Sequence, residues 1–285
     1  YESFQLVFRG PEGQAVPQVR ITATPWTLQN SSARLPAEDI RMFRVQYHPV
    51  RIPSNFEGPT GQWPDALLPA ASFDIPAGTT QPVWFTVYAR PDLPAGQYTG
   101  GIEAVINGQP PITVKVEVRI FDFALPVTPA LKTDFGFFRD GAVNGARAAG
   151  GKSSPESLLN AYRTDAFAHR VTLRELTQVS TVEQISQADR WIKTGASTIH
   201  VTSNLLDSPD TLRAVNDAIR TRDWRDRAFV HLGHNPPPAA WPDVEKTLAR
   251  WKQAAPDIRT LITSYGPTPF VSNANEEAAA LSSFS

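Results

Sequence analysis

The stretch Arg227-Ala-Phe-Val-His-Leu-Gly-His-Asn-Pro236 decides the interpretation of the second half of the chain. It predicts a short buried strand over residues 228–232, which ends at Gly233 and is followed by the polar pair His234 and Asn235 and by three prolines. In α/β folds, polar side chains at the carboxyl end of a strand lie where ligands bind and chemistry takes place. His234 and Asn235 are therefore the first candidate site residues.

Strand-like and helical segments alternate around this stretch, which predicts a parallel sheet. Ser154 before Pro155 and Gly195 are expected to begin and end helices. Strands are expected over 131–138, 171–173, 197–201, 228–232 and 260–264, and helices over 155–168, 182–194, 209–222 and 241–255. A closed (β/α)8 barrel needs eight strands. The region 127–285 is thus either a partial or truncated (β/α)8-type barrel, or an open sheet whose edge a second copy or a partner chain covers.

The first half of the chain has a different periodicity. Apolar and polar residues alternate over 81–90 and 112–120, and Asn107-Gly108 between two such runs is a hairpin signal. About seven strands punctuated by proline and glycine predict an antiparallel β-sandwich over 1–126. Pro126 and Pro129 stiffen the expected connector. The fold class is therefore multidomain, an all-β unit followed by an α/β unit.

Composition excludes several classes of function. The 27 basic and 28 acidic residues give a net charge of -1, so no global field attracts nucleic acid. No apolar run reaches the ~18 residues of a membrane span. The absence of cysteine excludes disulfides and cysteine-based zinc sites, and it fits a secreted or extracytoplasmic protein. The chain starts at Tyr1 rather than Met, as after removal of a leader or trimming.

Several short motifs resemble glycoside hydrolase family 123 and its uncharacterised relatives. The second half contributes Ala255-Pro256-Asp257 and Leu261-Ile262-Thr263. The first half contributes, in order, Pro64-Asp-Ala-Leu-Leu-Pro69, Gln81-Pro-Val-Trp84, Leu93-Pro-Ala-Gly-Gln-Tyr-Thr-Gly100 and Phe121-Asp-Phe-Ala-Leu-Pro126. The glycines and Tyr98 of the third motif are expected to shape turns and to pack. The resemblance implies a bacterial glycosidase with a β-sandwich and a TIM-type barrel, of which only the first part is present.

The resemblance also implies a mechanism that this sequence departs from. In that family a strand ends in Asp-Glu-Pro, and N-acetyl-β-hexosaminides, above all the N-acetylgalactosaminide, are cleaved with retention by substrate assistance. The Asp stabilises the acetamido group that attacks the anomeric carbon, while the Glu protonates the leaving oxygen. His234 and Asn235 stand in those positions, so neither the anion nor the usual acid is present. We expect either a divergent carbohydrate-active hydrolase or a non-catalytic relative that binds glycans or assembles with other subunits.

Other candidates for binding sugar hydroxyls lie near the predicted strand ends: Asp134, Asn204, Arg170 and Tyr265. Each also has a purely structural interpretation. Asp134 could be a loop or cap partner, and Asn204 could form an Asx turn. Arg170 could be a cation beside a helix terminus, and Tyr265 could have a packing role. His200, His231 and His234 lie on adjacent predicted strands and raise the question of zinc. His231 and His234 are three positions apart on one strand and should face opposite sides, so we expect no metal. No cofactor is expected.

Overall fold

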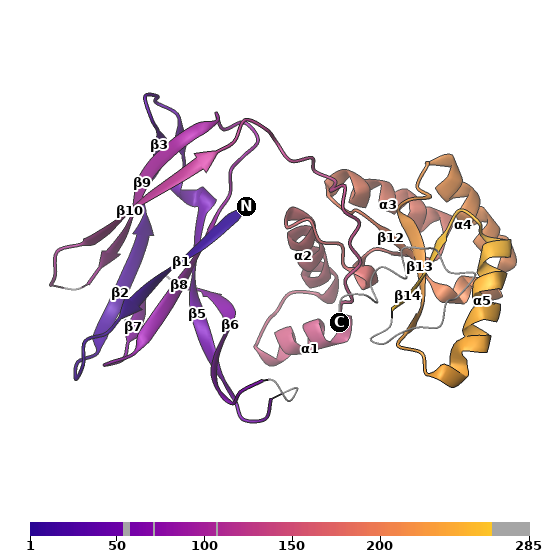
Figure 1. The fold of residues 1–285 in the computed structure, drawn as a ribbon, viewed down its shortest axis with the longest axis horizontal. Coiled ribbons are helices and arrows are strands. Elements are labelled where there is room, and N and C mark those ends of the chain that lie inside the picture. The colour runs from indigo at the N-terminus through magenta and orange to yellow at the C-terminus, as the bar shows by residue number, and fades with distance from the viewer. Residues whose placement is uncertain (54–57, 71, 107, 264–285) are drawn as a thin grey trace. The chain divides into compact units, whose positions relative to one another are not determined.

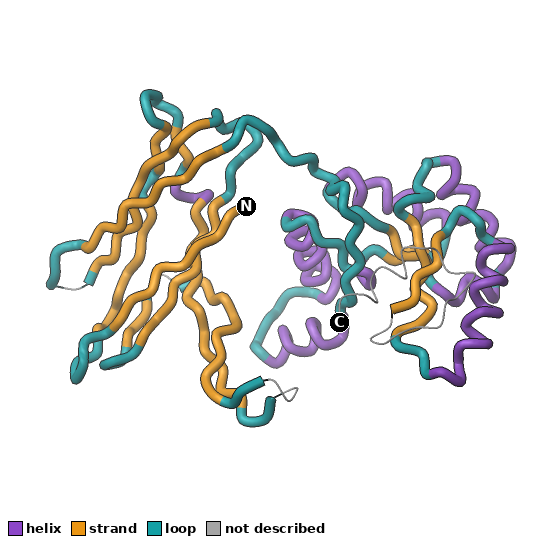
Figure 2. Tube along the Cα trace, viewed as in Figure 1, coloured by secondary structure: helices purple, strands orange, loops and turns teal. Residues whose placement is uncertain are grey.

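The computed structural model of the chain describes residues 1–53, 58–70, 72–106 and 108–263. The chain divides into two compact units, Tyr1–Leu125 and Pro126–Ser285. Strands form the first unit, whereas helices and strands alternate in the second (Figures 1 and 2). None of the helices in the described part of the chain is long and apolar enough to cross a membrane.

The first unit is an antiparallel β-sandwich, as the sequence predicts. One sheet has the order β1-β8-β5-β6, and the other has the order β4-β3-β9-β2-β7 with β10 also paired to β9. Both sheets contribute to a single core, which includes Trp26 and Phe85. The strands are β1 (Glu2–Arg9), β2 (Val16–Ala23), β3 (Trp26–Leu28), β4 (Arg34–Leu35), β5 (Ile40–Val50), β6 (Gly61–Pro69), β7 (Phe73–Ile75), β8 (Thr80–Val87), β9 (Gly96–Val105) and β10 (Ile112–Ile120).

Tyr98 packs in this core, as predicted, whereas Gly96 and Gly100 lie within strand β9 and not in turns, which corrects the prediction for them. Tyr98 is fully buried, and its hydroxyl donates to the carbonyl of Pro94 at 2.8 Å. Gly96 has a φ of +141°, which disfavours residues with a side chain. At Gly100 an added Cβ would lie 1.7 Å from Cδ1 of Trp26, so the indole occupies the space that a side chain would need.

Replacing Gly100 by alanine should therefore lower the free energy of unfolding by about 1–3 kcal/mol through overpacking against Trp26. Gly101→Ala is a matched control, because its added Cβ would lie 3.2 Å from the movable Thr113 methyl group. We expect the control to change stability by less than about 1 kcal/mol. Urea denaturation of both variants measures this difference, and equal midpoints would contradict the packing argument.

The second unit is a partial β/α barrel. Among the described residues its sheet has the order β11-β12-β13-β14, and every pair is parallel. Its strands are β11 (Gln178–Val179), β12 (Ile199–Val201), β13 (Ala228–His234) and β14 (Arg259–Thr263). Its helices are α1 (Arg139–Ala148), α2 (Pro155–Ala168), α3 (Val182–Thr194), α4 (Pro209–Thr221) and α5 (Trp241–Ala254). Short 3-10 turns lie at Arg174–Leu176, Ser203–Asp207 and Pro238–Ala240.

The predicted helix termini follow from local capping. The Ser154 hydroxyl accepts from the amide of Ser157 at 3.2 Å and begins α2 at Pro155. Gly195, with a φ of +128°, ends α3 as predicted. These caps are encoded within a few residues, which is why the sequence places α2 and α3 with the bounds that the structure has.

The predicted strands over 131–138 and 171–173 are wrong. Only an isolated parallel bridge joins Phe135 to Leu173, and Arg139 and Asp140, which directly follow the first segment, begin α1. Hydroxyl groups replace the missing ladder: the Ser197 Oγ accepts from the Thr133 amide at 2.9 Å. Two apolar residues of segment 131–138 are also exposed, 76% for Leu131 and 78% for Phe138. These two side chains are not buried, so they contribute no burial energy that would favour a strand.

Helices α3, α4 and α5 cover one face of the parallel sheet. Ile199 and Val201 of β12 and Ala228 and Val230 of β13 pack with residues of α3, α4 and α5 in one core. The intervening residues, among them His200 and His231, therefore face the other side.

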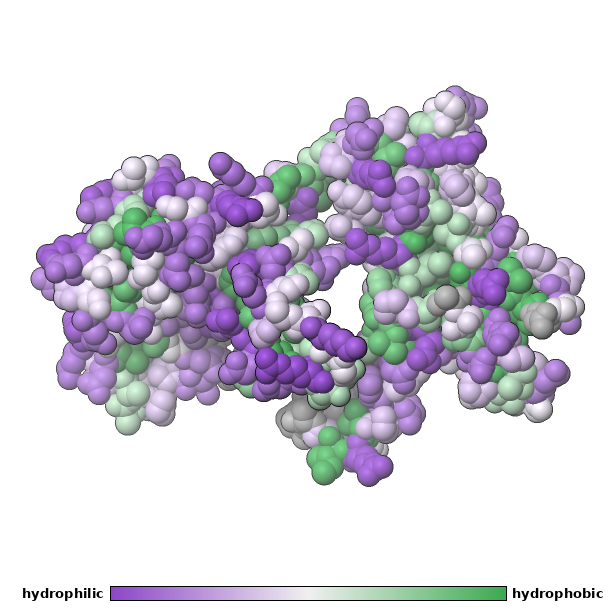
Figure 3. Space-filling model, turned by 180° about the vertical axis from the view of Figure 1, so that it is seen from behind, coloured by the Kyte–Doolittle hydropathy of each residue, from purple (hydrophilic) through white to green (hydrophobic). Residues whose placement is uncertain are grey.

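Hydrophilic residues cover most of the molecular face seen in Figure 3, with hydrophobic residues in smaller groups.

Candidate functional site

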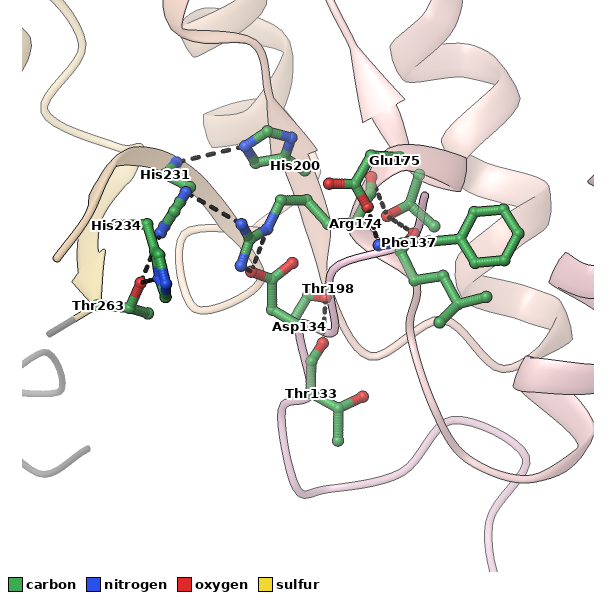
Figure 4. A network of polar contacts seen from close by, with 12 residues as sticks. Thr133, Asp134, Phe137, Arg174, Glu175, Thr198, His200, His231, His234 and Thr263 are labelled. Atoms are coloured by element: carbon green, nitrogen blue, oxygen red, sulfur yellow. Dashed lines mark hydrogen bonds and ion pairs between the residues drawn. The ribbon is translucent and has the colours of Figure 1, made fainter. Parts of the chain in front are cut away.

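Polar side chains gather on the sheet face opposite the helices, toward the carboxyl ends of β13 and β14. Figure 4 shows Arg174 between Asp134 and His231, and both His231 and His234 directed at Thr263. His231 and His234 belong to β13 and Thr263 ends β14, whereas Arg174 begins the turn that precedes β11. Segments distant in sequence thus meet at the edge where α/β folds place their ligand sites.

A β-bulge brings the two histidines to the same face. His231 pairs with Leu261 and Gly233 pairs with the next residue, Ile262, so Leu232 is an extra residue in β13. His231 Nε2 lies 3.1 Å and His234 Nδ1 lies 2.8 Å from the Thr263 Oγ1. The prediction that these imidazoles face opposite sides is wrong, because strict alternation fails where a residue is inserted.

The ion pair between Asp134 and Arg174 is the charged centre of the cluster. Asp134 Oδ2 lies 2.7 Å from Arg174 Nε and 2.6 Å from Nη2, and the side chains are only 10% and 14% exposed. Burial raises the pKa of the Asp134 carboxyl, while the Arg174 guanidinium opposes that rise. Arg174 Nη1 also lies 3.0 Å from His231 Nδ1. The structure thus gives Asp134 an ion-pair partner and links it to the histidines.

His200 lies under the cluster and is buried. Its Nε2 accepts from the backbone amide of His231 at 3.3 Å. Burial, with a contribution from the Arg174 charge, lowers the pKa of His200 to about 3. The same two causes lower the pKa of His231 to about 4. Both imidazoles are therefore neutral at neutral pH.

Of the other predicted site residues, Asn204 and Arg170 lie outside this hydrogen-bonded cluster, and Asn235 contacts it through its backbone. Asn204 is exposed in the 3-10 turn that follows β12. Arg170, with a φ of +63°, lies beyond the end of α2, and its Nη1 donates to the carbonyl of Pro126 at 2.7 Å. Asn235 is exposed next to His234, and its backbone N–H donates to the Thr263 carbonyl at 2.6 Å. Tyr265 lies outside the described residues.

Sequence reasoning missed Arg174 and Thr263. Polar residues that follow a strand are the stronger candidates, and Arg174 follows the predicted strand 171–173 whereas Arg170 precedes it. The same rule also selects Thr263 at the end of β14. Neither residue has an unusual sequence signature, so strand ends were the signal that could have found them.

The described residues offer no group of three His, Asp, Glu or Cys side chains arranged to hold a metal ion. Two imidazoles share one hydroxyl, and Arg174 brings a positive charge next to them.

The fold agrees with one solved glycosidase. No protein-family model and no curated protein matches the sequence. A family 123 glycoside hydrolase from Clostridium perfringens, described in connection with glycolipid glycan hydrolysis, is similar in structure with a TM-score of 0.66 and 10% identity. The chain has the fold of this hydrolase. The match covers 96% of this chain and 60% of the hydrolase, so the chain spans about 60% of that protein's length.

Two other solved structures are less similar. A GH5 xyloglucanase from Bacteroides ovatus has 11% identity and a TM-score of 0.24, with 95% of this chain and 66% of that chain covered. The Salmonella SafD adhesin has 12% identity and a TM-score of 0.22, with 42% of this chain and 98% of the adhesin covered. These two similarities are too low to support an inference.

The cluster suits the recognition of a neutral polar ligand. The charges of Asp134 and Arg174 balance each other, and both His200 and His231 are neutral at neutral pH. Imidazole, hydroxyl and amide groups can donate to and accept from hydroxyl or carbonyl oxygens. A strongly anionic ligand would meet no uncompensated positive charge within this set of residues.

Proposed function

We propose that this chain is a carbohydrate-active protein of glycoside hydrolase ancestry, which takes its glycan at the carboxyl ends of β13 and β14. The observation that carries the proposal is the position of the neutral cluster around His234 in a fold shared with a family 123 hydrolase. In barrel enzymes the ligand site is built at this end of the strands. The proposed ligands are N-acetyl-β-hexosaminides, and the proposed location is outside the cytoplasm.

The proposed activity is weak, because the cluster lacks a carboxylate that is ready for the reaction. Substrate-assisted cleavage needs an anion beside the acetamido group and an acid beside the leaving oxygen. An amide such as that of Asn235 cannot transfer a proton near neutral pH. Asp134 already forms an ion pair with Arg174, through two contacts of 2.7 and 2.6 Å to its Oδ2. The family's acid position therefore holds no carboxylic acid, and the loss of a general acid typically costs about 10²–10⁴ in rate.

The same observation favours a second candidate function, a relative that binds glycans or assembles with other subunits without cleaving them. His234 and Asn235 keep hydrogen-bonding capacity but lack the carboxylates that hydrolysis needs. The two candidates therefore differ in turnover and share the fold. Sugar binding separates a lectin-like role from a purely structural one.

The decisive experiment measures the release of aryl alcohol from aryl N-acetyl-β-galactosaminide and N-acetyl-β-glucosaminide. We expect the double variant His234→Asp with Asn235→Glu to exceed the unmodified chain by at least about 10²-fold. The two single variants are controls, because neither alone restores both roles. Asn235 has a φ of +47°, which glutamate tolerates less well, so the stability of each variant is measured alongside.

Titration calorimetry with N-acetylgalactosamine and N-acetylglucosamine completes the test. Binding without turnover, in both the unmodified chain and the double variant, would favour the non-catalytic candidate. The absence of both turnover and sugar binding would contradict carbohydrate activity and leave the assembly role.

A further inference from the structure

Arg174 fixes the tautomer of His231. A guanidinium has only donors, so the His231 Nδ1 that lies 3.0 Å from Arg174 Nη1 must be the unprotonated acceptor. Asp134 holds Nε and Nη2 of the same guanidinium, which leaves Nη1 directed at His231. A neutral imidazole with an unprotonated Nδ1 carries its proton on Nε2. His231 is therefore a donor at Nε2.

The Thr263 hydroxyl links the donor at His231 Nε2 to the imidazole of His234. His231 Nε2 lies 3.1 Å from Thr263 Oγ1, so the hydroxyl oxygen accepts from His231. A threonine hydroxyl has one proton of its own to donate. His234 Nδ1, at 2.8 Å from the same oxygen, is positioned to accept that proton. His234 then carries its own proton on Nε2.

We infer that Asp134, Arg174, His231 and Thr263 are positioning residues that hold His234 as a neutral donor at Nε2 for an acceptor oxygen of the ligand. The matching ligand groups are the hydroxyl, ether or acetamido carbonyl oxygens of a glycan. The identity of the ligand rests on the proposed function, whereas the proton arrangement rests on the geometry alone.

Two further observations support the inference. The bulge at Leu232 is what brings His231 and His234 to one hydroxyl, and bulges often re-aim side chains beside functional sites. Burial and the Arg174 charge lower the pKa of His231 to about 4, which keeps His231 neutral and able to accept from Arg174 at neutral pH.

Long-range ¹H–¹⁵N spectra of the imidazoles at pH 7 test the proton arrangement directly. We expect both His231 and His234 to be protonated on Nε2, with the signals assigned from His231→Gln and His234→Gln variants. Thr263→Val, which keeps the side-chain shape, should leave His231 protonated on Nε2 and convert His234 to a mixture of tautomers. Thr263→Ser should restore the original spectrum. A proton on Nδ1 of His234 in the unmodified chain, or an unchanged His234 spectrum in Thr263→Val, would overturn the inference.

Sugar binding provides a second readout that separates this inference from the proposed function. Thr263→Val should weaken the binding of N-acetylgalactosamine about 3–10-fold, as expected for one misaligned hydrogen bond, and Thr263→Ser should recover it. If the unmodified chain binds no sugar while the spectra are as expected, the proposed function fails and the proton arrangement stands. If sugar binds equally well to Thr263→Val, the proposed positioning role fails.

Discussion

Replacing Arg174 by alanine should lower the free energy of unfolding of the second unit by about 3–5 kcal/mol. The substitution leaves the Asp134 carboxylate in a place where its side chain is only 10% exposed, without the two guanidinium contacts at 2.6 and 2.7 Å. An unpaired buried charge costs more than the pair contributes, because its desolvation is no longer offset. Urea denaturation followed by far-UV circular dichroism measures the loss.

Two controls separate this effect from a general loss of an arginine. Arg213→Ala breaks the exposed ion pair with Asp210 and should change stability by less than about 1 kcal/mol. The joint replacement Arg174→Met with Asp134→Leu removes both buried charges and should cost less than Arg174→Ala alone. A loss in Arg174→Ala no larger than that in Arg213→Ala would show that Asp134 does not depend on this pair.

The cluster combines a buried ion pair with a chain of hydrogen-bonded side chains that reaches the surface. Asp134 and Arg174 cancel each other's charge below, and the hydrogen bonds pass through His231 and Thr263 to the exposed His234. On the proposed function, such an arrangement would orient a hydrogen-bond donor toward glycan hydroxyls without adding net charge. Under the proposed function, His234 and Asn235 would therefore contribute hydrogen bonds at this edge where the family has carboxylates.

Local sequence patterns predicted much of the fold for identifiable reasons. The bounds of α2 and α3 follow from Ser154, Pro155 and Gly195, whose effects act within one helical turn. The strand over 131–138 failed because the partners that satisfy its backbone, such as Ser197, come from a distant segment. Propensity within a short window contains no information about such partners.

The site was only partly predictable, because its geometry depends on pairing between strands. His234 and Asn235 were found from their position after a strand, and Asp134 from its place near another predicted strand. The bulge that turns His231 toward His234 is a mismatch between β13 and β14, and it exists only once the two strands are paired. Strict alternation along β13 alone therefore predicts opposite faces for His231 and His234, which is wrong.

Lowering the pH from 7 to 5 should lower the free energy of unfolding by about 2–4 kcal/mol through His200 and His231. Their pKa values in the folded chain are lowered to about 3 and about 4, chiefly by burial and then by Arg174. An unfolded imidazole titrates near pH ~6.5. Between these values the unfolded chain binds protons that the folded chain does not, so this stability is present above about pH 6.5 and is lost as the pH falls.

The variant His200→Gln tests the larger of the two contributions, because His231 is less buried. The amide oxygen of glutamine can accept from the His231 backbone amide but does not titrate, so about 2 kcal/mol of the difference between pH 7 and pH 5 should disappear. Leu212→Ala, a core variant of the same unit, should lower stability at both pH values and keep the difference. An unchanged pH dependence in His200→Gln would place the titrating groups outside this cluster.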